Sequence, residues 1–146
     1  MRNIIDLINE SLNIDNVKNQ IKAALDKNKN IGIISEKLDF HEIANAIQGA
    51  AKTYTVSVSD NNVDVAKFEN ALETAVKNIP SNSNPKVLIV NLVNAKPDIL
   101  NLIMPVILKK TIKNKEYSDV CFVCVFSKND ELPKPVESRL KPMFTL

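Results

Sequence analysis

The residues best placed to do chemistry lie in a short connection near residue 40. Ser35 and Lys37 fall in the segment 35–42, which follows the apolar run 31–34 and precedes a helical repeat of apolar residues. A strand, a loop and a helix at this spacing commonly bind phosphate, whose oxygens accept hydrogen bonds from consecutive backbone N–H groups. In a site of this kind, the Ser35 hydroxyl and the Lys37 ammonium would line the anion.

The same loop lacks what a phosphate cradle needs. It contains no glycine, although N–H groups turned inward require unusual φ angles and no Cβ in the way. It also carries three acidic side chains that would repel phosphate, namely Glu36, Asp39 and Glu42. The sequence therefore predicts a site that keeps its outline without its chemistry, which favours binding or assembly over catalysis.

Three segments, in this order, resemble landmarks of the AAA+ branch of P-loop ATPases. Residues 31–52 stand where the Walker A strand, loop and helix would lie, and residues 86–98 resemble the Walker B strand and the helix after it. Residues 125–140 resemble the sensor strand and the Ser-Arg segment that carries an arginine finger, and this match is the most specific. The resemblance covers residues 14–146 and lacks the family's helical lid.

Set against that family, the groups that handle the nucleotide are missing. Lys37 has no Ser or Thr beside it at the start of the helix, so the Walker A lysine has no secure counterpart. Asn91 replaces the aspartate that holds magnesium, and a neutral amide is a poor ligand for a hard cation. Leu92 replaces the catalytic glutamate. The resemblance therefore implies no ATP hydrolysis and no bound cofactor.

Two positions of the family are retained. Asn129 matches the sensor asparagine that contacts the attacking water. Arg139 matches the finger that one subunit inserts into its neighbour's nucleotide site. A degenerate site combined with a Ser-x-Arg-type segment is similar to the δ′ subunit of clamp loaders. The alternatives are a turn residue for Asn129 and a surface arginine in an ordinary ion pair for Arg139.

Basic residues gather in two places. Lys109, Lys110 and Lys113 follow one another near the end of a predicted helix, whereas Lys134 and Lys141 lie near the end of the sequence. In a parallel sheet the two groups could lie close together and contact phosphates of a nucleic acid. The alternative is a solvated helix end, where lysines also interact favourably with the helix dipole.

The composition is that of one soluble domain. The chain has 146 residues, a net charge of +2, 45% hydrophobic residues and 25% charged residues. No segment approaches the roughly 20 apolar residues that a membrane span needs. Cys121 and Cys124 lie inside an apolar run, which favours a reduced, cytoplasmic protein. Their spacing on a strand points them to opposite faces, so we expect no shared metal.

The elements that position these residues alternate along the chain after two leading helices, 3–12 and one that begins at Asp15. Strands are expected at 31–34, 54–59, 87–90, 120–126 and 143–146, and helices at 40–51, 63–79 and 97–112. This pattern predicts a three-layer α/β fold with a parallel five-stranded sheet, like the base subdomain of an AAA+ ATPase. A strand order of 5-1-4-3-2 would support that lineage, whereas 2-1-3-4-5 would contradict it.

The leading functional hypothesis is a non-catalytic, AAA+-like interaction subunit. It would act in an oligomer of its own chain or on a related ATPase, in DNA replication or in a phage or mobile-element assembly. The first alternative is an enzyme or sensor that binds a nucleotide at the remodelled loop through Ser35, Lys37 and Asn91. A nucleic-acid-binding module and a plain doubly wound domain of another lineage are the others. No membrane partner is expected.

Overall fold

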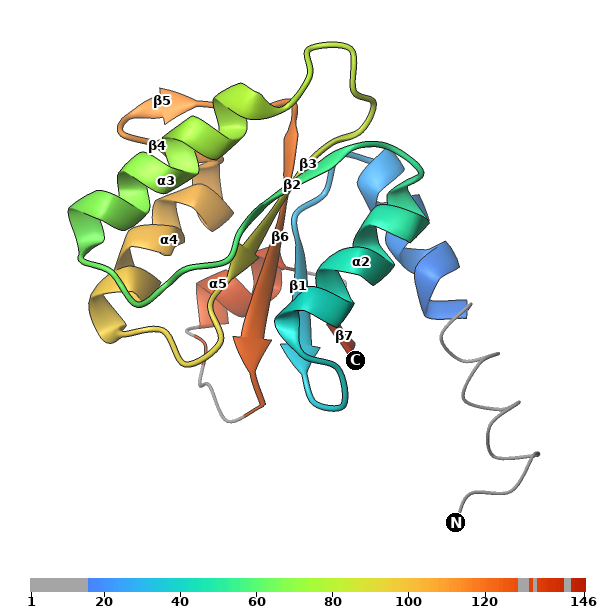
Figure 1. The fold of residues 1–146 in the computed structure, drawn as a ribbon, viewed down its shortest axis with the longest axis horizontal. Coiled ribbons are helices and arrows are strands. Elements are labelled where there is room, and N and C mark those ends of the chain that lie inside the picture. The colour runs from blue at the N-terminus through green and yellow to red at the C-terminus, as the bar shows by residue number, and fades with distance from the viewer. Residues whose placement is uncertain (1–15, 129–131, 133, 141–142) are drawn as a thin grey trace.

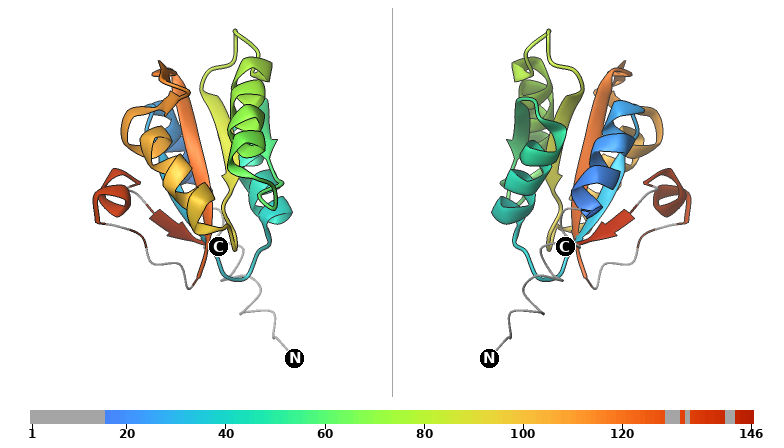
Figure 2. Two further views of the ribbon diagram at one scale, coloured as in Figure 1. Left: turned by 90° about the vertical axis from the view of Figure 1, so that its left-hand side faces the viewer. Right: turned by 90° about the vertical axis from the view of Figure 1, so that its right-hand side faces the viewer.

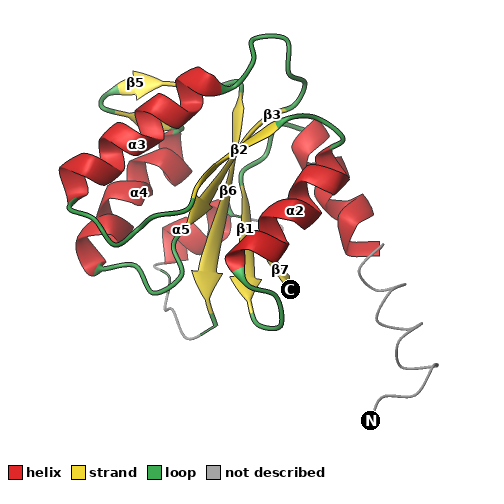
Figure 3. Ribbon diagram, in the orientation of Figure 1, coloured by secondary structure: helices red, strands yellow, loops and turns green. Residues whose placement is uncertain are grey.

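The computed structural model describes residues 16–128, 132, 134–140 and 143–146. Residues 16–26 form the first described helix, whereas the predicted helix 3–12 and its neighbour Asp15 lie outside the described residues. The other elements, coloured by type in Figure 3, are β1 (Ile31–Ser35), α2 (Phe40–Ala51), β2 (Thr55–Val58), α3 (Val65–Asn78), β3 (Lys86–Asn91), α4 (Pro97–Lys109), β4 (Thr111–Ile112), β5 (Lys115–Glu116), β6 (Val120–Ser127), α5 (Lys134–Arg139) and β7 (Met143–Thr145).

Five of the strands form one parallel sheet in the order β7-β1-β6-β3-β2. Numbered along the chain as the five strands of this sheet, the order is 5-1-4-3-2. The prediction of a parallel five-stranded α/β fold is therefore confirmed, and the strand order is the one expected for a P-loop lineage.

Helices cover both faces of the sheet and make three layers. In Figure 1, α3 and α4 lie on the left of the sheet, and α2 and the helix of residues 16–26 lie on the right. The side views of Figure 2 place α5 and β7 at one edge and the pair formed by α3 and β2 at the other. Among the described residues, no helix combines the length and apolar character that crossing a bilayer requires.

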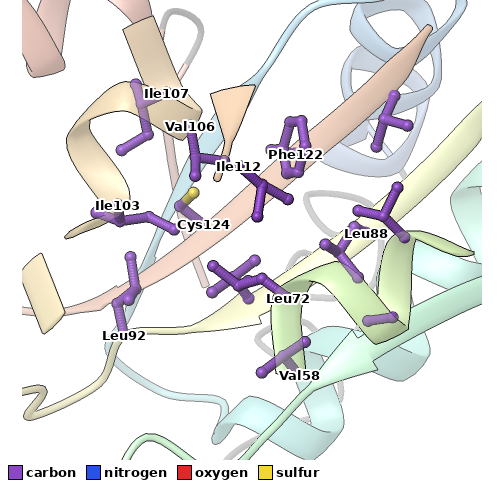
Figure 4. Close-up of a cluster of buried hydrophobic side chains, with 14 of the residues drawn as sticks. Val58, Leu72, Leu88, Leu92, Ile103, Val106, Ile107, Ile112, Phe122 and Cys124 are labelled. Carbon is purple, nitrogen blue, oxygen red and sulfur yellow. The ribbon is translucent and has the colours of Figure 1, made fainter. Parts of the chain in front are cut away.

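Strand β6 shows why the sheet needs helices on both faces. Phe122 and Cys124 belong to the apolar cluster under α3 and α4, part of which is drawn in Figure 4. Cys121 and Val123 belong to the second cluster, under α2 and the helix of residues 16–26. The prediction that the two cysteines point to opposite faces is thus confirmed, and both thiols are buried.

One helix boundary was predicted too late in the chain. Helix α4 ends at Lys109 and not near Ile112, because Lys110 takes a left-handed conformation (φ 53°). Its backbone N–H bonds to the oxygens of Pro105 and Val106 and closes the last turn. Residues 111–112 and 115–116 then form an antiparallel hairpin where the sequence predicted the end of a helix. Ile112 is buried as a residue of the hairpin strand β4 and not as a residue of the helix.

Candidate functional site

The predicted phosphate loop follows β1 directly, and its backbone donors already have an acceptor. The N–H groups of Glu36, Lys37 and Leu38 all donate to the backbone oxygen of Leu146, at 3.1, 2.7 and 3.0 Å. Three consecutive N–H groups that converge on one oxygen form the arrangement that elsewhere binds an anion. Here that position is filled by the backbone oxygen of Leu146, from the same chain.

Strand β7 brings Leu146 to the loop. It pairs in parallel with β1, and the N–H of Leu146 donates to the oxygen of Ile34 at 2.9 Å. A Cβ built on Gly32 would lie 3.1 Å from the side chain of Met143 and 3.3 Å from that of Leu140. Glycine at this position therefore lets β7 and the end of α5 approach β1 closely.

The side chains of the loop also make contacts within the protein. The Ser35 hydroxyl donates to the oxygen of Leu38 at 2.6 Å, which closes the turn. Glu36 pairs with Lys128, just after β6, at 3.1 Å. Lys37 is exposed. Of the two residues expected to line a phosphate site, Ser35 is thus used to shape the loop.

The first turn of α2 carries its own anion. The Asp39 carboxylate accepts a hydrogen bond from the N–H of Glu42 at 2.9 Å, and the Glu42 carboxylate accepts one from the N–H of Asp39 at 3.3 Å. This reciprocal pair is a capping box, as the sequence predicted. The helix end that would face a phosphate is therefore occupied by a carboxylate.

At the end of β3, Asn91 holds neighbouring loops together. Its Nδ2 donates to the oxygen of Ser59 at 2.9 Å, and its Oδ1 accepts from the N–H of Val93 at 3.1 Å. Asn61 adds hydrogen bonds from its Nδ2 to the oxygens of Asn91 and Val93. The amide that stands in the magnesium-ligand position thus serves the local fold. Leu92, in the position of the catalytic glutamate, is fully buried in the apolar cluster of Figure 4.

The end of β6 joins the same edge of the sheet. The Ser127 hydroxyl accepts from the N–H of Asn94 at 2.8 Å and donates to its Oδ1 at 3.1 Å. Neither Ser127 nor Asn94 was predicted as a site residue. Their positions in the sequence could have predicted this contact, because polar residues just after neighbouring parallel strands meet at one edge of the sheet. Nothing in the sequence could have indicated Leu146, since its contribution is a backbone oxygen.

The candidates near the end of the sequence are placed only in part. Arg139 is the last residue of α5 and is exposed, and Lys134 is the exposed first residue of the same helix. Asn129 and Lys141 lie outside the described residues. The pairing of the predicted sensor Asn129 with the predicted finger Arg139 therefore stays a prediction.

The basic residues of the hairpin group lie far from Lys134 of the second group. Lys109, Lys110 and Lys113 are at the hairpin end of α4, far from α5 with its Lys134 (Figure 1). Of the second group the structure places only Lys134, and it does not lie beside the first group, because α4 separates the hairpin from α5. Lys141 lies outside the described residues. Lys109 is exposed.

Two lysines of the hairpin group already have partners. The Lys110 ammonium donates to the backbone oxygens of Asn28 (3.1 Å) and Val120, and its burial lowers its pKa. Lys113 bonds to Asn70 and pairs with Glu73 at 3.5 Å. These contacts join α4 and the hairpin to neighbouring elements.

A metal site was not expected. In the described part of the chain, no three His, Cys, Asp or Glu side chains are grouped to hold an ion. Burial raises the pKa of the Cys124 thiol to about 12 and also raises that of Cys121, so both are neutral near pH 7. A neutral thiol is a poor nucleophile and a poor metal ligand.

Together, the strand order and the helices on both faces define the fold. The fold is that of the base subdomain of AAA+ P-loop ATPases, with the loop of residues 35–39 and the ends of β3 and β6 at the edge where that class binds nucleotide.

Solved structures with the same fold include the RuvB Holliday junction branch migration motor of Thermotoga maritima. It is 15% identical with a TM-score of 0.59, over 92% of this chain and 44% of that one. A point mutant of the same motor is 16% identical with a TM-score of 0.56, over 86% of this chain and 42% of that one. Saccharomyces cerevisiae RIF2 is 15% identical with a TM-score of 0.50, over 87% of this chain and 54% of that one. The chain thus spans less than half the length of the RuvB structures. Neither the models of known protein families nor the curated protein sequences give a match.

Proposed function

We propose that this chain is a non-catalytic, AAA+-like interaction subunit. It acts in an oligomer of its own chain or beside an active ATPase, in DNA replication or in a phage-related assembly. The fold supports the lineage, and the contacts at the loop after β1 support the absence of catalysis. The observation that carries the proposal is that Glu36, Lys37 and Leu38 direct their N–H groups to Leu146.

Three further features of the site support the same conclusion. Asp39 provides the negative charge at the start of α2, so a phosphate there would meet a carboxylate. The amide of Asn91 is hydrogen-bonded on both sides and has no charge to offer magnesium. Leu92 has no group to polarise water and lies in the core. A nucleotide would therefore find neither donors for its phosphates nor a ligand for its metal.

Calorimetric titration of the full chain with ATP and Mg²⁺ tests the proposal. We expect no heat beyond dilution, with or without the metal. Saturable binding would favour the alternative of a nucleotide sensor. Binding that then disappears in Lys37→Ala, and persists in the control Lys29→Ala, would assign it to the remodelled loop.

Arg139 is the residue proposed to contact an ATPase partner. It is exposed at the end of α5, where a second protein can reach it. Once a co-purifying ATPase is identified, its hydrolysis rate should rise when the wild-type chain is added. Arg139→Ala should remove that increase, whereas Lys134→Ala, on the same helix, should keep it. An increase that survives Arg139→Ala would reject the finger role.

A further inference from the structure

We propose that two copies of this chain associate through the free edge of β2 and form one continuous sheet about a two-fold axis. This inference rests on the proposed role as an interaction subunit and names the surface and the partner. Strand β2 stands at the end of the strand order and pairs with β3 on one side. Figure 1 looks onto its other side, with α3 and α2 flanking it.

Strand β2 is short, with four residues, and contains no lysine, no proline and no bulge. Edge strands are commonly guarded by lysine, proline or a bulge. Strand β2 reads Thr-Val-Ser-Val, and its register with β3 is continuous from Thr55 to Val58. Because alternate residues of a paired strand turn their N–H and C=O groups away from the neighbour, β2 presents donors and acceptors outward. An edge of this kind suits the addition of another strand.

A groove of about 500 Å³ runs beside this edge and gives a partner room. Most of its lining side chains are short, and they come from β2 and α3: Val56, Ser57, Ala71, Thr74, Ala75 and Asn78. A two-fold axis that passes between the two β2 strands, perpendicular to the joined sheet, would bring α3 of a second copy alongside α3 on the same face. Small side chains on α3 allow two helices to approach in this way.

The charges that flank β2 on either side favour a second copy of this chain as the partner. Lys52 and Asp60 are both exposed, four residues before and four residues after Val56. Neither residue belongs to β2: Lys52 is the left-handed cap at the end of α2, and Asp60 accepts a hydrogen bond from the N–H of Asn62 in the loop after β2. In an antiparallel pair centred on Val56, the connection that carries Lys52 in one copy comes beside the loop that carries Asp60 in the other. Opposite charges that come close in this way attract each other, whereas like charges repel. The edge is therefore complementary to itself, as a two-fold interface requires.

The same register gives the other residues of the edge suitable neighbours. Tyr54, which is 60% exposed, would face Val58 of the second copy. Thr55 would face Ser57, which pairs two hydroxyl side chains. Facing residues must lie on the same side of the joined sheet, and this register meets that condition because each pair is an even number of positions apart. Pairing would thus cover the exposed tyrosine ring.

Sedimentation equilibrium of the full chain and two charge-reversal variants tests the interface. The wild-type chain should show twice the 16.3 kDa mass of one chain. Lys52→Glu and Asp60→Lys should each be monomeric, because each places like charges opposite each other. An equimolar mixture of the two variants should recover the double mass, because the reversed charges then attract. Lys96→Glu, at the start of α4, changes the net charge equally and should remain dimeric.

Two results would overturn the β2 interface. One is a wild-type chain of single mass at every concentration tested. The other is a dimer that both charge reversals leave unchanged, with circular dichroism showing that the variants are folded. Neither result affects the test of the proposed function by nucleotide titration. A dimer that binds ATP would instead reject the proposed function and keep the interface.

Discussion

The N–H of Lys37 lies 2.7 Å from the backbone oxygen of Leu146, although the two residues are separated by most of the sequence. This hydrogen bond is the shortest of three that end on the same oxygen. It joins the loop after β1, the first strand of the sheet in the chain, to the residue after β7, the last. The position that an anion takes in similar loops is therefore filled from within the fold.

Deletion of Leu146 should free the three loop N–H groups. We expect the amide hydrogens of Glu36, Lys37 and Leu38 to exchange faster, and the free energy of unfolding to fall by about 1–2 kcal/mol, because hydrogen bonds are lost with only water to replace them. Hydrogen exchange followed by NMR and urea unfolding measure the two effects. Lys37→Ala keeps the backbone donors and serves as the control. Unchanged exchange of all three amides would show that Leu146 does not hold the loop.

Asn91→Asp should destabilise the fold and not create a magnesium site. The amide donates to the oxygen of Ser59, and a carboxylate in its place would set two acceptors against each other. We expect a loss of about 1–3 kcal/mol in urea unfolding. Asn101→Asp, on the exposed side of α4, is the matched control and should change stability little. Stabilisation of the Asn91 variant by added Mg²⁺ would contradict the structural role.

Leu92→Glu should be far more disruptive. Leu92 is fully buried, so the substitution puts a carboxyl group into an apolar cluster. We expect a loss of about 4 kcal/mol or more, since no partner is at hand for the buried group. Thermal unfolding measures the change, and Leu92→Met, which keeps the volume, should cost much less. A Glu variant as stable as the wild type would show that position 92 can turn towards the nucleotide edge.

The buried thiol of Cys124 predicts how stability depends on alkaline pH. Its pKa is about 12 in the folded chain, against 9.0 for the ordinary thiol. Between these values the unfolded chain loses the thiol proton and the folded chain keeps it, so stability falls as the pH rises. The slope from this one group is about 1.4 kcal/mol per pH unit. Urea unfolding at several pH values above 9 should show it, and Cys124→Ala should flatten the curve. An equal slope in the variant would rule out this origin.

The sequence by itself determined the layers and the order of elements. Apolar runs such as 87–90 and 120–126 fixed the central strands, because a strand covered on both faces needs apolar residues at every position. The pair of Asp39 and Glu42 fixed the start of α2 through local hydrogen bonds. The alternation of strands and helices along the sequence also predicted the five-stranded parallel sheet, whose strand order is now observed.

The tertiary structure alone decided how the site is used. The acceptor for the loop is a backbone oxygen of Leu146, which no side-chain pattern can reveal. The end of α4 depended on the left-handed turn at Lys110 and on the buried Ile112 of the hairpin. The separation of Lys134 from the lysines of the hairpin followed from the direction of α4 across the sheet. Each of these depends on contacts between residues distant in the sequence, whereas helical and strand patterns report only on near neighbours.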